Sequence, residues 1–502
     1  MLVHNVLSRR LGVHIAATVF SLGLLTGTCT AQTLRVGSEI PAQLDPAFAS
    51  SDAEILVLSN VYDYLVDVDA GNQIQPRLAQ SWSVSDDSLS WTFTLREGVT
   101  FHSGAAFGPD DVVATFERLR DPDADLPTSD LYANLRSVEA TGPAQVTFTL
   151  AEPNPFFLFD LTDNHAVIID SEALELGRVF DGTGPFAVSD YAAEDRMTLR
   201  ANPDHFAGAP GVATLELIFF AEQAAAVSAL RGGQLDLVLR MPTPLFQSLE
   251  GARGIERHRV ATNGFDLIRL RTDRTPGKDP LVVQALKLAV DREAIVEVVT
   301  DGLAELGSDT PIGPLYEAYH RAEVAPPARD VDRARELLAE AGYGDGLELV
   351  LHVPDSGDRP DLAVVLKEQL EQAGFEIELR LQPESVYYGD GGWLDVDFGI
   401  TGWGSRPVPQ FYFETMIACG AVWNEAHYCD PDVDALIELA GSTPSENERA
   451  AAYAELQRIL ASEGPYVIPY FFPQFAALRD TFTGLELKAF PGRTDLAAIR
   501  PR

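Results

Sequence analysis

The stretch from Leu78 to Leu119, LAQSWSVSDDSLSWTFTLREGVTFHSGAAFGPDDVVATFERL, carries the clearest structural pattern in the chain. Apolar and polar residues alternate in its first half, which predicts a half-buried strand with three large side chains on one face: Trp91, Phe93 and Leu95. Residues 96–98 then turn the chain, and residues 99–101 are predicted to return as a second short strand. Pro109 suits the first turn of a helix whose apolar stripe ends at Leu119.

Helices and strands alternate through the rest of the chain, without low-complexity linkers or short repeats. Glycines end several of the predicted helices, and an apolar strand follows. Because two such helix–strand steps are consecutive in the C-terminal half, they are typical of a largely parallel α/β sheet. The predicted pairs of helix and strand are 221–231 with 235–239, 331–341 with 347–352, 361–373 with 375–381, and 446–462 with 466–472.

The N-terminus is typical of an export signal. Arg9 and Arg10 precede a mostly apolar run, residues 11–25, that is too short to cross a bilayer comfortably. Small residues follow, and we expect cleavage after Ala31, so that residues 1–31 form a signal peptide. Lipid attachment at Cys29 is less favoured, because leucine is absent from the third position before that cysteine.

The composition is strongly acidic, with a formal net charge of −38. Removing residues 1–31 deletes two arginines and no acid, so the charge becomes −38 − 2 = −40. Such a surface repels phosphate backbones and anionic lipids, which argues against a nucleic-acid or membrane-surface partner. The remaining 502 − 31 = 471 residues exceed the usual size of one core, so two or more lobes are expected.

Several further segments resemble family 5 of the bacterial extracellular solute-binding proteins, as do LAxSW and LREGVxFHSG in the opening stretch. Members of that family are receptors for peptides, nickel complexes, opines and similar solutes, and they feed ABC importers. The resemblance extends over nearly the whole mature chain, and it rests on the order and spacing of these segments together. They are GTGPFAVSDY (182–191), ANPDHFAG (201–208), LRGGQLDLVL (230–239), QALKLAVDREAIV (284–296), APPARDVDRARELLAEAGY (325–343) and TGWGSRP (401–407).

The resemblance implies an α/β fold of two lobes joined by crossing strands, a periplasmic binding protein of type II in its peptide-binding subclass. An extra subdomain is expected within the N-terminal half. We expect lobe I to comprise residues 32–48, 166–265 and 473–502, the inserted subdomain to span 49–165, and lobe II to span 266–472. The hinge candidates are two apolar strands, at 265–270 and 466–472.

Signatures of common enzyme classes are absent, among them GxxxxGK[ST], HExxH and GxSxG. Residues 182–187, GTGPFA, fit a loose dinucleotide pattern, but the strand-like residues after Pro185 do not supply the helix N-terminus that a phosphate needs. We therefore expect a tight turn there. The histidines are scattered and no zinc-type Cys/His cluster occurs, so we expect no metal site and no cofactor.

The most suggestive candidate for a ligand site is Gly402–Pro407, GWGSRP, which follows a predicted strand at 398–401. Ligands of open α/β sheets bind outside such strand ends. Trp403 offers a flat apolar wall, Gly404 allows close backbone approach, and Arg406 can clamp a carboxylate through two hydrogen bonds. We predict that these residues and Ser405 line the ligand cleft; a loop with a packed tryptophan and a solvated arginine is the alternative.

The resemblance gives Ser405 and Arg406 a further meaning. In peptide-binding members the stretch just after Gly-Trp carries an aspartate that pairs with the ammonium group of the peptide. An arginine there would repel an ammonium group and attract a carboxylate. Our hypothesis is that an anionic solute, such as an opine or an acidic amino-acid conjugate, is favoured over an unmodified peptide N-terminus.

The loop between Cys419 and Cys429 supplies the next candidates, Trp423 and Asn424. A tryptophan can stack on a ligand, and an asparagine offers both donors and acceptors. A surface loop is an equally good reading of this segment. The two cysteines fit either a disulfide in an exported chain or two buried free thiols.

Three other residues are predicted to face the cleft. Asn263 and Arg269 flank the first hinge candidate, although a crossing strand also needs polar residues to cover its exposed side. Phe48 is the aromatic residue of a possible cleft edge at residues 42–50, just after the first strand.

The sequence thus predicts a periplasmic receptor that closes two lobes around a peptide-like or opine-like solute and delivers it to an ABC permease and its ATPase. We expect a monomer with no enzymatic activity. A nickel-chelate receptor is a variant of the same class, and a sensor or chemoreceptor partner would replace the transporter. A secreted hydrolase is the rival from another class, and it requires a nucleophile–base pair or a metal cluster in the cleft.

Overall fold

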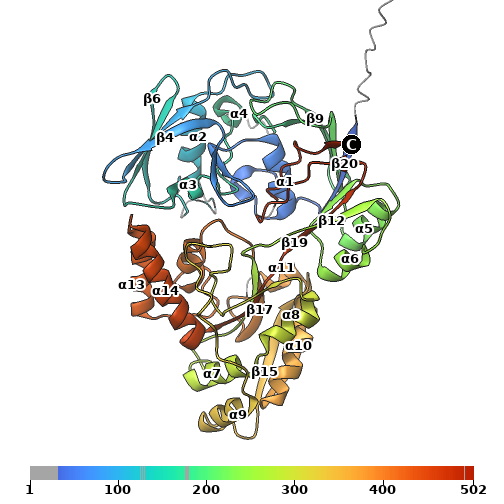
Figure 1. Cartoon of the computed structure of the whole chain (residues 1–502). Coiled ribbons are helices and arrows are strands. Elements are labelled where there is room, and N and C mark those ends of the chain that lie inside the picture. Colours follow the sequence, from blue (N-terminus) through green and yellow to red (C-terminus); the bar gives the residue numbers. More distant parts are fainter. Residues whose placement is uncertain are drawn as a thin grey trace, which may run out of the picture.

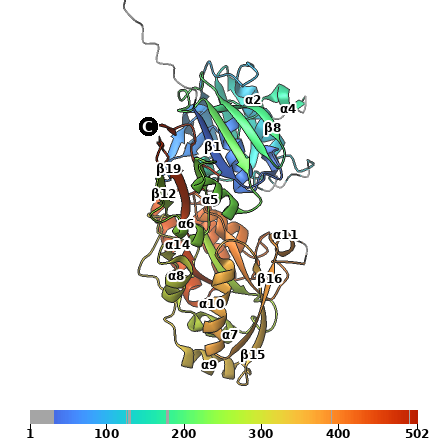
Figure 2. The same cartoon turned by 90° about the vertical axis from the view of Figure 1, so that its right-hand side faces the viewer.

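The protein is described here by a computed structural model, which covers residues 32–502 except 125, 127, 129–130, 176–179, 390 and 491. The expected signal peptide, residues 1–31, and Cys29 lie outside the described residues. The described chain forms two α/β lobes stacked end to end, an upper one built from both termini and a lower one built from the middle of the sequence (Figures 1 and 2).

A seven-stranded sheet forms the centre of the upper lobe. Its middle strand, β1 (Thr33–Ser38), runs parallel to both of its neighbours, so the carboxyl ends of all three strands meet at one edge. In spatial order the sheet contains β12 (Ile255–Val260), β19 (Gln474–Arg479), β11 (Leu237–Leu239), β1, β10 (Thr214–Phe219), β9 (Arg196–Ala201) and β8 (Phe186–Ala192). Helices α5 (Gln223–Arg231) and α6 (Thr243–Ser248) pack on it through a separate apolar cluster.

The opening stretch of sequence builds a second, four-stranded antiparallel sheet in the same lobe, in the order β4 (Ala79–Val84), β5 (Ser90–Leu95), β7 (Gln145–Leu150) and β6 (Leu135–Gly142). The alternation predicted for β5 is confirmed, because Trp91, Phe93 and Leu95 are buried. The predicted helix is α2 (Pro109–Leu119). Side chains from both sheets share one continuous core, so this subdomain is not packed independently.

The strand predicted at residues 99–101 is wrong. This segment makes a single bridge, between Thr100 and Ala106, and the loop folds back on itself through hydrogen bonds from Phe101 N to Ala105 O and from Phe107 N to Val99 O. Val99 and Phe101 are nevertheless buried. Three residues of alternating pattern are too few to distinguish a strand from an apolar loop anchor.

The lower lobe is built on a six-stranded sheet, in the order β14 (Glu305–Leu306), β18 (Tyr466–Phe471), β13 (Phe265–Leu270), β17 (Phe398–Trp403), β15 (Leu347–Pro354) and β16 (Phe375–Gln382). The predicted parallel step is confirmed, since β15 runs parallel to β16 and to β17. Its main helices are α7 (Pro280–Ala289), α8 (Arg292–Thr300), α9 (Val331–Glu340), α10 (Arg359–Gln372), α13 (Pro431–Ser442) and α14 (Glu446–Glu463).

The remaining elements are short and connect these layers. They are the 3-10 turn at Pro46–Phe48, α1 (Asp52–Val61), β2 (Val66–Val68), β3 (Ile74–Pro76), α3 (Phe157–Asp160), α4 (Ser171–Glu175), α11 (Glu384–Tyr387), α12 (Gln410–Tyr412), the π-helical turn Phe413–Ile417, β20 (Phe482–Thr483) and β21 (Arg500–Pro501). The predicted tight turn at 182–187 lies against α1, since a Cβ on Gly182 would lie 2.1 Å from the carbonyl oxygen of Val61.

The chain passes between the two central sheets twice, through residues 261–264 and through residues 472–473. These crossing segments contact each other: Phe472 N donates to Gly264 O at 2.9 Å, and Thr262 Oγ1 donates to Phe472 O at 2.6 Å. The strands that we named as hinge candidates, β13 and β18, are antiparallel neighbours directly beside them. The lobe boundaries and the hinge role remain predictions.

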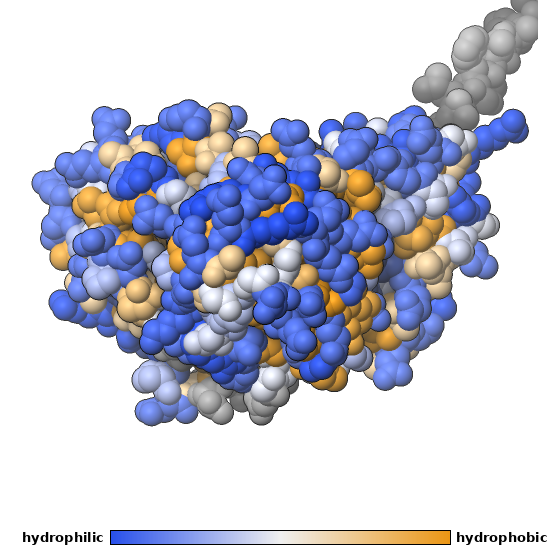
Figure 3. All heavy atoms as spheres, turned by 90° about the horizontal axis from the view of Figure 1, so that it is seen from below, coloured by the Kyte–Doolittle hydropathy of each residue, from blue (hydrophilic) through white to orange (hydrophobic). Residues whose placement is uncertain are grey.

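The surface of the lower lobe is mainly hydrophilic (Figure 3). Seen from below, the lower lobe is covered mostly by polar and charged residues, with apolar residues in scattered patches between them (Figure 3). Within the part of the chain that the structure describes, no helix is both long enough and apolar enough to traverse a bilayer.

Candidate functional site

The loop after β17 is held by a buried polar network in the lower lobe. Trp403 is 7% exposed, and its indole Nε1 donates to Glu425 Oε1 at 3.0 Å. The other carboxylate oxygen of Glu425 accepts from Thr401 Oγ1 at 2.6 Å and from Arg269 Nε at 3.1 Å. This hydrogen bond fixes the tryptophan, whose ring also packs against the rings of Trp393, Tyr412 and Trp423.

Arg269 lies inside the lobe and not at the cleft surface. Its side chain is fully buried, and its guanidinium also donates to the backbone oxygens of Val396 and Trp393. All three of its nitrogens have partners within the lobe. Arg269 thus holds Glu425 and the 393–396 segment in place. The prediction that Arg269 faces the cleft is wrong.

Gly404 and Ser405 are pinned against the first crossing segment. The Oγ of Ser405 accepts a hydrogen bond from Asn263 N at 3.0 Å, and the hydroxyl of Tyr412 donates to Gly404 O at 2.7 Å. Asn263 is 1% exposed, and its side-chain Oδ1 is buried without a hydrogen-bond partner. Four of the predicted site residues therefore meet at the junction of the two lobes: Asn263, Trp403, Gly404 and Ser405.

Arg406 projects from this loop toward the upper lobe. Its guanidinium lies 4.3 Å from the ring centroid of Phe411 and 3.8 Å from Asp163 of the upper lobe, and its side chain remains 34% exposed. The next residue also touches the upper lobe, since Asn72 Nδ2 donates to Pro407 O at 2.7 Å. Arg406 therefore stands between the lobes with donor capacity left over.

Trp423 extends the aromatic wall, whereas Asn424 does not. Trp423 is 37% exposed, and its ring centroid lies 6.0 Å from those of both Trp403 and Phe411. The amide of Asn424 is turned inward, where it donates to Ala418 O and Tyr428 O and accepts from Tyr428 N. It braces the loop that the disulfide between Cys419 and Cys429 closes.

Phe48 lies apart from this cluster, on the 3-10 turn of the upper lobe, with 39% of its surface exposed. The structure therefore brings together six of the predicted residues, Asn263, Trp403, Gly404, Ser405, Arg406 and Trp423, while Arg269 and Asn424 serve the interior of the lower lobe.

Acidic side chains of the upper lobe approach this region. Asp160, at the end of α3, lies near Glu414 of the lower lobe, and burial together with that negative charge raises the pKa of Asp160 to about 8. Burial also raises the pKa of Glu414. In contrast, burial alone would raise the pKa of Asp163, but its neighbours His165 and Arg406 lower it to about 2.

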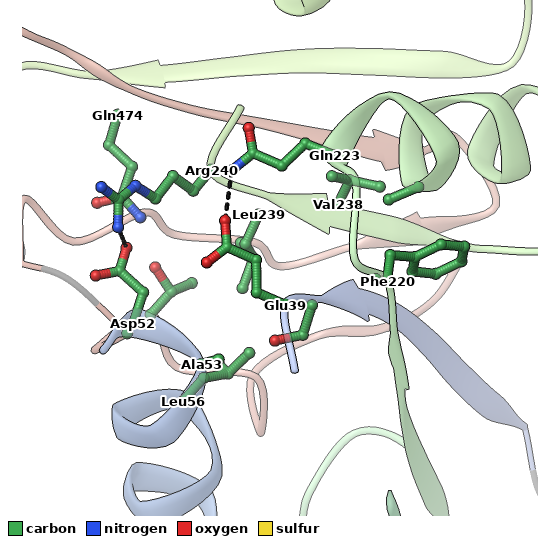
Figure 4. A pocket seen from close by; sticks show the side chains of 15 residues that line it. Glu39, Asp52, Ala53, Leu56, Phe220, Gln223, Val238, Leu239, Arg240 and Gln474 are labelled. Atoms are coloured by element: carbon green, nitrogen blue, oxygen red, sulfur yellow. Dashed lines mark hydrogen bonds and ion pairs between the residues drawn. The ribbon is translucent and has the colours of Figure 1, made fainter. Parts of the chain in front are cut away.

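A second group of residues, which the sequence did not reveal, lines a pocket at the carboxyl ends of β1 and β11 (Figure 4). Ser38 ends β1 and Glu39 follows it, Arg240 follows β11, and Asp52 begins α1. Arg240 Nη1 pairs with Asp52 Oδ2 at 2.5 Å, and Gln223 Nε2 donates to Glu39 Oε1 at 2.7 Å. The rule that ligands bind at the ends of parallel strands could have found it.

This pocket lies on the side of the upper lobe that faces the lower one. The pKa of Arg240 is raised chiefly by Asp52, and the carboxylates of Glu39 and of Glu384 in the lower lobe add to the shift. Close by, Thr243 Oγ1 donates to Asp358 Oδ2 across the lobes at 2.8 Å. Both groups of residues therefore border the space between the lobes.

Comparison with known proteins agrees with this architecture. The model of the bacterial extracellular solute-binding proteins, family 5 Middle, matches residues 73–424. A probable di/tripeptide-binding protein 5 of Pseudomonas aeruginosa (strain UCBPP-PA14) is 30% identical over 527 aligned positions, which cover 95% of this chain and 97% of that protein.

Solved structures share the fold. The dipeptide-binding protein of Pseudoalteromonas sp. SM9913, in complex with Met-Leu, aligns with a TM-score of 0.83 at 24% identity and covers 94% of this chain and 100% of that one. The protein AgaA of A. tumefaciens R10, in complex with agropinic acid, aligns with a TM-score of 0.81 at 23% identity over 94% of this chain and 99% of that one. The chain belongs to family 5 of the bacterial extracellular solute-binding proteins.

Proposed function

We propose that the protein is the substrate-binding receptor of an ABC importer, which captures a solute between its two lobes in the periplasm and delivers it to the membrane permease. The observation that carries this proposal is the pair of residue groups that border the space between the lobes, Trp403–Arg406 below and Glu39–Arg240 above. A solute that touches both groups favours the closed arrangement over the open one.

The solute is peptide-like or opine-like and carries at least one carboxylate. Arg406 supports this choice, because it keeps free donors between the lobes and its planar fork matches a carboxylate. Trp403 and Trp423 supply an apolar wall beside it, and Asn263, Gly404 and Ser405 form the adjoining backbone edge. Arg269, Asn424 and Phe48 are left out of the proposed contact set.

The protein acts without covalent chemistry and passes its solute to a permease that is driven by a separate ATPase. No GxxxxGK[ST] motif occurs in the sequence, so ATP hydrolysis belongs to the partner. In the described part of the chain, no three His, Cys, Asp or Glu side chains gather as a metal site. The receptor works as a monomer that is exported by cleavage after Ala31.

Calorimetric titration of the purified protein tests this function with three probes: the dipeptide Leu-Glu, its counterpart Leu-Gln amide, which has no carboxylate, and the opine N-(1-carboxyethyl)leucine. We expect Leu-Glu and the opine to bind at least about tenfold more tightly than Leu-Gln amide, because one charge-assisted hydrogen bond contributes roughly 1.5–3 kcal/mol. Each probe should be recovered unchanged, as judged by mass spectrometry.

Two results would contradict the proposal. Conversion of any probe into a new compound would indicate a secreted hydrolase instead of a receptor. Failure of all three probes to bind would contradict the proposed receptor function. Equal affinity for Leu-Glu and Leu-Gln amide would leave a receptor without the preference for a carboxylate.

A further inference from the structure

The pocket at the carboxyl ends of β1 and β11 has the features of a binding site, which distinguish it from an imperfectly packed cavity. One of its polar side chains is unpaired: the hydroxyl of Thr494, which is 2% exposed and lines the pocket, has no hydrogen-bond partner. Such a buried donor and acceptor costs free energy unless something pairs with it.

The backbone is shaped to leave this space open. Gly492 has φ of 62°, and a Cβ there would lie 2.6 Å from the Cβ of Ile55 on α1. Only glycine allows the 492–494 segment to approach α1 so closely, and this approach sets Thr494 at the pocket. Arg240 is also held with φ of 53°, a left-handed conformation that is uncommon for a residue with a side chain.

Charge and polarity divide the pocket into two parts. Figure 4 shows the carboxylates of Glu39 and Asp52 beside the guanidinium of Arg240, with Ala53 and Leu56 on another side. Because the ion pair with Asp52 offsets the charge of Arg240, the carboxylate of Glu39 leaves the group with one net negative charge. Each carboxylate also has an oxygen that is not used by Arg240 or Gln223.

The lower lobe does not cancel this charge. Arg359, a basic group of the lower lobe that is an electrostatic neighbour of Arg240, is already paired with Asp266 at 3.4 Å and with Glu384 at 3.0 Å. The pocket therefore presents acceptors and an apolar wall, whereas the loop after β17 presents the donors of Arg406.

We propose that this pocket holds the protonated amino group of the solute, with Glu39 and Asp52 as its acceptors and the adjoining apolar part of the solute against Ala53 and Leu56. The proposal rests on the proposed function and adds an orientation to it. The solute places its amine in the upper lobe and its carboxylate at Arg406 in the lower lobe. This orientation predicts a zwitterionic solute that has an apolar group next to its amine.

The test compares Leu-Glu with N-acetyl-Leu-Glu, which lacks the positive charge, on the unaltered protein and on three variants. We expect acetylation to lower the affinity at least about tenfold in the parent protein, since it removes a charge-assisted hydrogen bond. Glu39→Gln and Asp52→Asn should each weaken Leu-Glu by about tenfold and reduce the effect of acetylation. The matched control is Glu222→Gln, an exposed acid next to α5 that does not line the pocket, and it should change neither affinity by more than about twofold.

Equal binding of the two probes to the parent protein would overturn this proposal while the receptor function stood, because Leu-Glu would still bind. Absence of binding by both probes would instead remove the proposed function, and this inference with it. The comparison on the parent protein does not depend on folding of the variants, and circular dichroism checks that each variant is folded.

Discussion

The loop after β17 and the pocket beside β1 border the same gap, but they are built in opposite ways. The loop is one continuous segment, Gly402–Pro407, backed by a buried network around Glu425. The pocket is assembled from segments far apart in the sequence, at residues 37–39, 52–56, 220–226, 238–240, 474 and 492–494. A site made of one segment can be found by its composition, whereas a site made of six segments becomes visible only in the fold.

The two regions also differ in the charge that they present. Arg406 offers donors from the lower lobe, whereas Glu39 and Asp52 offer acceptors from the upper lobe. One side of the cleft is therefore positively charged and the other is negatively charged. A solute with one positive and one negative group can pair with both lobes only in one orientation. Stability and binding measurements can examine each region separately.

The largest expected effect comes from removing the support of the lower region. Glu425→Ala should lower the free energy of unfolding by about 3–5 kcal/mol, because it leaves the buried guanidinium of Arg269 without its carboxylate. Thermal unfolding followed by circular dichroism measures this loss. Glu384→Ala, which removes an exposed carboxylate from α11, is the control and should cost at most about 1 kcal/mol. Similar losses in the two variants would contradict the role given to the network.

Arg406→Gln should weaken binding of Leu-Glu by about 10–100-fold and leave the unfolding temperature nearly unchanged. The guanidinium is one-third exposed and its partners are a ring and a distant carboxylate, so little stability depends on it. Calorimetric titration supplies the affinity. Arg380→Gln, an exposed arginine paired with Glu378 on β16, serves as the matched control. An unchanged affinity for Leu-Glu in Arg406→Gln would place the carboxylate elsewhere.

The smallest effect concerns the acids between the two regions and depends on pH. The folded protein holds the pKa of Asp160 at about 8, above its ordinary value of 3.8, so the folded state keeps a proton that the unfolded state loses. Burial of Asp160 therefore does not lower the free energy of unfolding below about pH 4. Above that pH it lowers the free energy of unfolding by an amount that grows as the pH rises toward 8.

Asp160→Asn should thus stabilise the protein at pH 8 by more than about 1.4 kcal/mol, which corresponds to one pKa unit, and should have no effect at pH 4. Unfolding measured at pH 4, 6 and 8 would show the difference between variant and parent widen with pH. Asp190→Asn, which changes an exposed acid on β8, is the control variant measured beside it. A constant difference for Asp160→Asn would contradict its burial as an acid between the lobes.

Much of the fold could be predicted from sequence, because its elements have strong local patterns. The helix that follows Asp330 begins and ends where capping residues indicate, and the strands after it alternate clearly. The error at residues 99–101 shows that an alternating pattern of only three residues does not identify a strand. Val99 and Phe101 are buried there without belonging to a strand.

The site was predicted less completely, for a physical reason. Polarity in a sequence does not say which way a side chain points: Arg269 and Asn424 are as polar as Arg406, but both bond inside the lower lobe. Arg240 lies one residue beyond a strand that the pattern predicted, and its importance depends on Asp52 from a distant helix. Such partners are unknown until the sheet order is known.

Hydrogen exchange with and without Leu-Glu tests the central claim, that one solute is held by both lobes, most directly. The account predicts slower exchange at two separate places, the amides of residues 404–406 in the lower lobe and those of residues 38–40 in the upper lobe, at the same solute concentration. Slower exchange at only one of these places, with the other unchanged at saturation, would contradict it.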